Sequence, residues 1–91
     1  MSNIIADPDR IDELAQQLRE FARETQDGLG RVASLLTDLG RGDWQDDKQK
    51  DFETRFEQEI AAPIQRAIEA LETQEVPYLS RLADQLREYL G

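Results

Sequence analysis

Cysteine and histidine are both absent from this 91-residue sequence. Without thiols and imidazoles the chain lacks disulfides and the usual ligands of zinc and haem. No apolar run approaches the roughly 20 residues that a membrane-spanning helix needs. The first ten residues, MSNIIADPDR, also lack the basic-then-apolar order of a signal peptide. We therefore expect no cofactor, no bound metal and no insertion into a membrane.

Basic residues are also scarce, because 11 Lys and Arg stand against 20 Asp and Glu, for a net charge of −9. Nucleic acid binding needs a basic surface that displaces counterions from phosphates, so we expect no nucleic acid partner. High charge with low hydropathy can also indicate disorder. Against disorder, only five Gly and three Pro interrupt the chain, and its apolar residues recur with helical spacing.

The first helix is predicted over residues 8–39. Asp7 is a suitable N-cap and Pro8 a suitable first helical residue. Apolar positions then follow in alternating steps of three and four, as in a heptad seam flanked by Ala15, Ala22, Leu29 and Leu36. We interpret the helix-interior glycines Gly28 and Gly30 as sites of close helix packing or of a slight bend. The seam comprises Ile11, Leu14, Leu18, Phe21, Thr25, Gly28, Val32, Leu35 and Leu39.

A turn is predicted at residues 40–43 and a second helix at residues 44–90. Gly40 suits a left-handed C-cap, Asp43 can cap the next helix, and Trp44 would be its first residue. Pro63 and Pro77 each remove a backbone donor, so we expect kinks near them. The apolar stripe of this helix includes Phe52, Phe56, Ile60, Ile64, Leu71 and Leu82.

The predicted fold class is all-α, with residues 1–91 forming one antiparallel helical-hairpin domain. A short connection makes the two helices antiparallel neighbours. Each helix then carries more apolar surface than a single pairing covers, so we expect two hairpins to dock into a dimeric four-helix bundle. The expected packing face consists of Ile11, Leu14, Leu18, Phe21, Val32, Leu35, Phe52, Phe56, Ile60, Ile64, Leu71 and Leu82.

Acidic residues cluster beside the turn, at Asp43, Asp46, Asp47, Asp51 and Glu53. A calcium-binding loop of the EF-hand type starting at Asp43 would need Gly where Lys48 stands and Glu where Thr54 stands. We interpret the cluster as acids that favour a helix N-terminus. Ser34 and Ser80 have no histidine to activate them, and a hairpin encloses no cleft, so we expect no catalytic residues and no enzymatic activity.

Trp44 is the only tryptophan and lies in the expected turn, ahead of Phe52 and Phe56. One interpretation is a staple that fixes the turn by packing against the opposing helix. The other is an interface anchor, because tryptophan is enriched among binding hot spots. Both hold if a partner's helix end covers the ring.

The turn motif Gly42-Asp43-Trp44-Gln45-Asp46 and the helix that follows it resemble the WXG family, the Esx-type substrates of bacterial type VII secretion. Two features depart from the family pattern. Asp46 stands where the Trp-x-Gly turn has glycine, and aspartate can adopt many glycine-like conformations. The Tyr-x-x-x-Asp/Glu export signal is missing, since Leu82 follows Tyr78 by four residues and only Leu90 and Gly91 follow Tyr89.

The resemblance implies a non-enzymatic interaction module, a dimeric helical bundle that acts as a type VII secretion substrate or secretion partner. It implies a homodimer or a heterodimer with a related hairpin, in the cytoplasm or secreted without a cleaved signal peptide. An alternative is a cytosolic adaptor or chaperone that holds an amphipathic helix of another protein. A further alternative is a structural coiled-coil component of a larger assembly.

Overall fold

The computed structural model describes residues 6–90, which are helical apart from Ala6, Asp7 and one turn. Residues 1–5 and 91 lie outside the described part. Of the first ten residues, in which we expect no signal peptide, the structure therefore describes only the second half. The described residues contain no strand, and none of their helices is long and apolar enough to cross a membrane. The all-α prediction is confirmed for these residues.

Two long helical segments surround the turn. The first is α1 (Pro8–Arg41), which begins at the predicted residue and ends two residues later than predicted. The second begins at Asp47, three residues later than predicted, and stays helical to Leu90. Its parts are α2 (Asp47–Phe56), η1 (Glu57–Ala61), α3 (Ala62–Ala70), η2 (Leu71–Glu75) and α4 (Val76–Leu90).

The chain divides into two compact units, and α1 contributes to both. Described residues 6–22 and 69–90 form the first unit, and residues 23–68 form the second. The first contains the start of α1 with η2 and α4. The second contains the rest of α1, the turn, α2, η1 and most of α3. Whether the two units act as a single domain stays a prediction.

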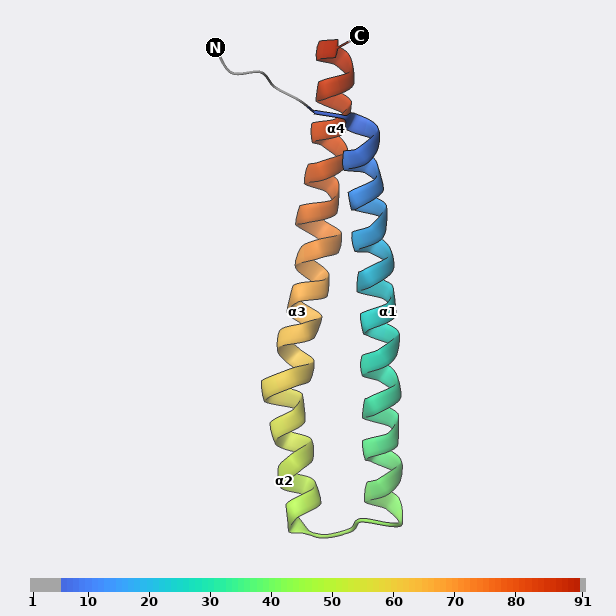
Figure 1. The fold of residues 1–91 in the computed structure, drawn as a ribbon. Coiled ribbons are helices and arrows are strands. Elements are labelled where there is room, and N and C mark those ends of the chain that lie inside the picture. Colours follow the sequence, from blue (N-terminus) through green and yellow to red (C-terminus); the bar gives the residue numbers. More distant parts are fainter. Residues whose placement is uncertain (1–5, 91) are drawn as a thin grey trace. The chain divides into compact units, whose positions relative to one another are not determined.

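In the first unit, the start of α1 lies beside α4, which runs in the opposite direction (Figure 1). Its buried side chains are small: Ala15, Ala22, Val76 and Ala83. Arg87 of α4 donates hydrogen bonds of 2.8 Å to Asp9 and 2.6 Å to Asp12, near the beginning of α1. These two bonds raise the pKa of Arg87 further above its usual range, so the guanidinium stays charged.

In the second unit, the end of α1 lies antiparallel to α2 (Figure 1). Leu36, Ala61 and Ile68 are buried here, together with one polar side chain, Gln49. The Gln49 amide donates hydrogen bonds to the carbonyl of Leu36, at 3.4 Å, and to Glu53. A buried amide group needs such partners, because an unsatisfied one costs about 1–3 kcal/mol.

Each of the two helix-interior prolines follows a π-helical turn. The π-helical turn η1 ends two residues before Pro63, and η2 ends two residues before Pro77. Pro63 and Pro77 are thereby the second residues of α3 and α4, each just after the wider turn. The wider π turns make room for the rings, so the chain stays helical past both prolines. The kinks near Pro63 and Pro77 stay a prediction.

The prediction of a left-handed cap at Gly40 is wrong. Gly40 lies within α1, and none of the described residues has a positive φ. Instead, a methyl group at Gly40 would lie 2.6 Å from Nε2 of Gln49. An alanine here would force the buried Gln49 amide to move, so glycine is favoured by this close approach and not by backbone conformation.

The cap of the second helix is Asp46, so the prediction of Asp43 is also wrong. The Asp46 side chain accepts a 2.8 Å hydrogen bond from the backbone N–H of Gln49, as an N-cap does. Its backbone is extended, with φ of −149° and ψ of −180°. Aspartate at this position therefore adopts no glycine-like turn conformation. Residues 42–46 connect the two helical segments, so the connection has five residues, one more than the predicted turn at residues 40–43.

We predict that Gly40→Ala lowers the free energy of unfolding by about 1–3 kcal/mol relative to Gly30→Ala. Both changes gain about 1 kcal/mol of helix propensity. Only the first displaces the Gln49 amide, because a methyl group at Gly30 meets no atom within 4 Å. Urea unfolding at one fixed protein concentration measures the difference. Equal stabilities of the two variants would contradict the role of Gly40.

We predict that Asp46→Ala costs about 1 kcal/mol of unfolding free energy, whereas Asp46→Gly costs only a few tenths. Alanine removes the cap bond to Gln49 and offers nothing in return. Glycine leaves the first amides accessible to water, so the cost is smaller. Thermal and urea unfolding of both variants test the order, and an alanine variant as stable as the glycine variant would exclude a capping role.

Candidate interaction surfaces

Large apolar side chains lie outside both small cores. In the first unit, Leu14 is 50% exposed, Phe21 is 58% exposed, and Tyr78 is also exposed. A phenylalanine left this exposed gives up most of the free energy of its burial, about 1.5–3 kcal/mol. The first unit thus offers an apolar face on α1 that its own α4 does not cover.

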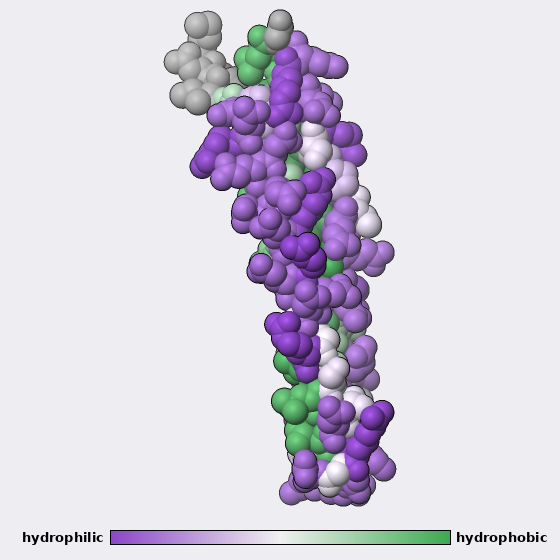
Figure 2. Space-filling model, turned by 90° about the vertical axis from the view of Figure 1, so that its right-hand side faces the viewer, coloured by the Kyte–Doolittle hydropathy of each residue, from purple (hydrophilic) through white to green (hydrophobic). Residues whose placement is uncertain are grey.

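The second unit also exposes large apolar side chains. Leu35 is 61% exposed, and Val32, Phe52 and Ile60 are about half exposed. Figure 2 views the molecule from the side of α1 and shows hydrophobic surface gathered toward the turn. Contiguous apolar surface of this kind marks an interaction site in a soluble protein.

None of the residues expected to form the packing face is fully buried. Leu14, Phe21, Val32, Leu35, Phe52 and Ile60 are exposed, and the others are half-buried: Ile11, Leu18, Phe56, Ile64, Leu71 and Leu82. The contact within each unit uses the neighbouring line of residues instead. That line was visible as the flank of the seam, at Ala15, Ala22 and Leu36.

The apolar pattern of the second helical segment included the buried Ile68 but missed its other buried residues. Nothing in the sequence indicated that Gln49 is buried, because glutamine is normally exposed. Ala61, Val76 and Ala83 are small or unremarkable in the apolar pattern. A usable signal was their spacing: Ala61 precedes Ile68 by seven residues, and Val76 precedes Ala83 by seven, as Ala15 precedes Ala22.

Trp44 begins a row of three aromatic side chains beside the turn. Its ring centroid lies 6.3 Å from that of Phe52, and Phe52 lies 6.5 Å from Phe56. Trp44 also donates its backbone N–H to the carbonyl of Leu39, at 2.8 Å. Trp44 is 36% exposed, so the residue is partly covered and partly accessible to solvent. This arrangement is compatible with both interpretations of Trp44, as a staple that fixes the turn and as an anchor for a partner.

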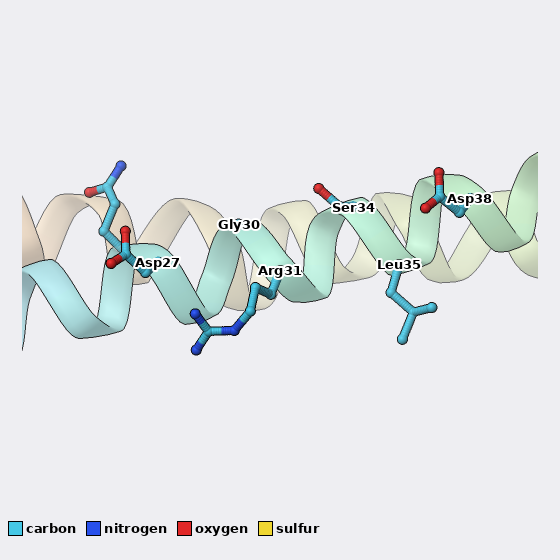
Figure 3. Close-up of a pocket in the computed structure, with 7 residues that line it drawn as sticks. Asp27, Gly30, Arg31, Ser34, Leu35 and Asp38 are labelled. Carbon is cyan, nitrogen blue, oxygen red and sulfur yellow. The ribbon is translucent and has the colours of Figure 1, made fainter.

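The polar groove on α1 does not resemble an active site. It is lined by Gln26, Asp27, Gly30, Arg31, Ser34, Leu35 and Asp38. Figure 3 shows Ser34 and Asp38 projecting from one edge of the helix and Leu35 from the opposite edge. Catalytic and ligand sites instead bring a few polar groups together in an enclosed pocket.

The acidic residues near the turn do not converge either. Within residues 6–90, no three carboxylates are grouped so that they could hold a metal ion. Asp46 serves as the helix cap, and Glu53 accepts from Gln49. Both carboxylates therefore act on the second helix itself, as the interpretation of the cluster as helix-start acids requires.

Comparison with known proteins gives a consistent result. The chain is similar to the crystal structure of the secreted protein ESXB from Bacillus anthracis str. Sterne, with a TM-score of 0.80 and 27% sequence identity. The similarity covers 100% of both chains. No curated protein matches the chain.

The fold of this chain is therefore similar to that of ESXB over its whole length. The WXG100 family, described as proteins of 100 residues with WXG, matches residues 3–88. The two helical segments, the tryptophan between them and both comparisons all indicate the same family. The chain belongs to the WXG100 family, whose members are small helical proteins associated with type VII secretion.

Proposed function

We propose that this protein is a non-enzymatic interaction module, a dimeric helical bundle that acts as a substrate or a partner in type VII secretion. The observation that carries the proposal is the exposure of large apolar side chains in both units, while alanines provide much of the burial. WXG100 proteins pair as hairpin dimers, so the partner that we propose is a second helical hairpin. ESXB is a secreted protein, which supports a secretory role here.

The energetics of each unit favour a partner. The first unit buries three alanines and one valine, and the second buries two aliphatic side chains, one alanine and one glutamine. Burial stabilises by about 25 cal/mol per Å² of apolar surface, so a core of small side chains contributes little. Docking a second helical hairpin on Leu14, Phe21, Leu35 and Phe52 would bury the larger side chains and complete a four-helix core.

We predict that Leu35→Glu weakens dimerisation about 100-fold or more, because it places a charge where the partner would bury a leucine. Ser34→Glu is the matched control, since Ser34 lies next in the chain, is exposed, and projects from the opposite edge of α1 (Figure 3). Sedimentation equilibrium at micromolar concentrations measures both. A wild-type chain that stays a compact, stable monomer would contradict the proposed dimer.

The same pair of variants links assembly to secretion. This chain lacks the Tyr-x-x-x-Asp/Glu signal, so a partner hairpin has to supply it. In a bacterium with a type VII system and such a partner, we expect the tagged wild-type chain and Ser34→Glu in the culture medium, and Leu35→Glu retained in the cell. Co-expression with neighbouring genes identifies the partner. A chain that dimerises but stays in the cell with or without the secretion ATPase would contradict the secretory role. A chain that folds only in a one-to-one complex with an unrelated helix would support the adaptor instead.

For the tryptophan we predict that Trp44→Ala lowers the unfolding free energy by about 1–2 kcal/mol, less than the 3 kcal/mol or more of a fully buried tryptophan. The ring is partly exposed, and its identified aromatic neighbour is Phe52. A double-mutant cycle with Phe52→Ala should give a coupling of about 0.5–1.5 kcal/mol. No coupling, together with lost partner binding, would make Trp44 an anchor and not a staple.

A further inference from the structure

We infer that the π-helical turn η1 holds one residue more than a regular helix would, and that this excess turns Ile60 outward to a partner and Ala61 inward to the core. The inference rests on the proposed function and deepens it by naming a partner contact and the device that presents it. It concerns the second unit alone, because η1 and the residues compared with it all lie between residues 23 and 68.

The excess follows from the spacing of two buried side chains. Gln49 and Ile68 are both buried in the second unit and are 19 residues apart. Five turns of an α-helix take about 18 residues, so positions on one side of a straight helix would be 18 apart. The nineteenth residue corresponds to a rotation of about 100°, which would carry Ile68 away from the core. The segment between the two positions therefore contains one residue too many.

The hydrogen bonding of η1 shows where this residue is absorbed. The backbone N–H of Ala62 donates to the carbonyl of Glu57, five residues earlier, whereas an α-helix bonds residues four apart. In a regular helix Ile60 would face the core, because it stands eleven residues, about three turns, after Gln49. Instead Ile60 is 45% exposed, and Ala61 is only 4% exposed. The inward position has moved on by one residue.

The same shift brings Ile60 into line with Phe52 on the outside. The two residues are eight apart, but with one residue absorbed their phase is that of residues seven apart, nearly two turns. Their exposed fractions agree, at 45% and 47%. Stabilisation grows with the apolar area buried, so a unit that buries an alanine and exposes an isoleucine forgoes part of it. A second hairpin that covers Phe52 and Ile60 recovers this contribution.

The residue count, and not the proline, carries the inference. Pro63 stands two residues after η1, and the wider turn also makes room for its ring. The excess, however, is fixed by the buried positions on either side, and it does not change when the ring is removed. Pro63→Ala should therefore keep η1 and leave Ile60 outside.

The count can be tested by changing it in both directions at one place. In the full-length Pro63→Ala chain, the exposed Gln58 is deleted in one variant, and an alanine is inserted after it in the other. We expect the deletion to keep the urea midpoint of Pro63→Ala, because a regular α-helix then places Ala61 and Ile68 inward. The insertion should lower the midpoint by about a third or more, because a second excess residue rotates Ile68 outward by about 100°.

A helix without an excess residue would respond equally to both changes, since each rotates the following residues by the same angle in opposite directions. Equal midpoints of the deletion and insertion variants would therefore overturn the excess in η1.

The orientation can be tested with single cysteines, because the native sequence contains none. The Ile60→Cys and Ala61→Cys chains are labelled with a water-soluble maleimide, alone and combined with Leu35→Glu, which supplies the monomer. In the monomer we expect the Ile60→Cys chain to react about tenfold faster or more, because labelling of the buried position needs local opening. Without Leu35→Glu, the Ile60→Cys chain should slow about fivefold or more as the partner covers it. The Ala61→Cys chain should stay slow in both backgrounds.

The outcomes separate the inference from the proposed function. Equal labelling of the two monomeric chains, or faster labelling of the Ala61→Cys chain, would overturn the orientation set by η1. A chain that dimerises without slowing the labelling of Ile60→Cys would overturn the partner contact of Ile60. A wild-type chain that sediments only as a monomer contradicts the proposed function instead, and the deletion and insertion pair then still decides whether η1 holds an excess residue.

Discussion

Two packed helices can cover only one line of residues on each other, and this constraint governs the rest of the structure. In this protein the covered line is mostly alanine, with Ala15 and Ala22 on α1 and Ala83 on α4. Small side chains allow the helix axes to approach closely, since the distance depends on the residues at the contact. Several of the larger apolar side chains, Leu14 and Phe21 among them, then remain exposed at the surface.

The turn depends on the same close approach. Gln49 is the one polar residue among the buried side chains that the structure describes, and it links α2 to the last turns of α1 through the carbonyl of Leu36. Gly40 makes room for it. A buried amide with partners on both helices has few alternative positions, because any slip of α2 along α1 would leave it unsatisfied. Gln49 therefore fixes the register where the chain reverses.

The sequence predicted what local chemistry determines. The start of α1 at Pro8 follows from a capping aspartate and a proline, and the hairpin class follows from long helical periodicity with one glycine-rich interruption. The sequence did not predict which of two adjacent apolar lines faces inward. One apolar line consists of residues 14, 21 and 35, and the other of residues 15, 22 and 36. The two lines are offset by one position, so the helical period is compatible with either line facing inward. Size was the better guide in the first unit, where Ala15 and Ala22 lie inside and Leu14 and Phe21 outside. Leu36 in the second unit is large and nevertheless buried.

The turn motif has aspartate where the family's pattern has glycine, and the position of Asp46 gives a physical reason why either residue fits. In Trp44-Gln45-Asp46, the third residue is the N-cap of α2 and has an extended backbone. Aspartate is among the best N-cap residues, and glycine is an acceptable one because it leaves the first amides open to water. A position whose requirement is a cap with an extended backbone can therefore hold either residue. Its physical role is to begin a helix directly after the tryptophan, and the aspartate of this chain satisfies it with a hydrogen bond that glycine lacks.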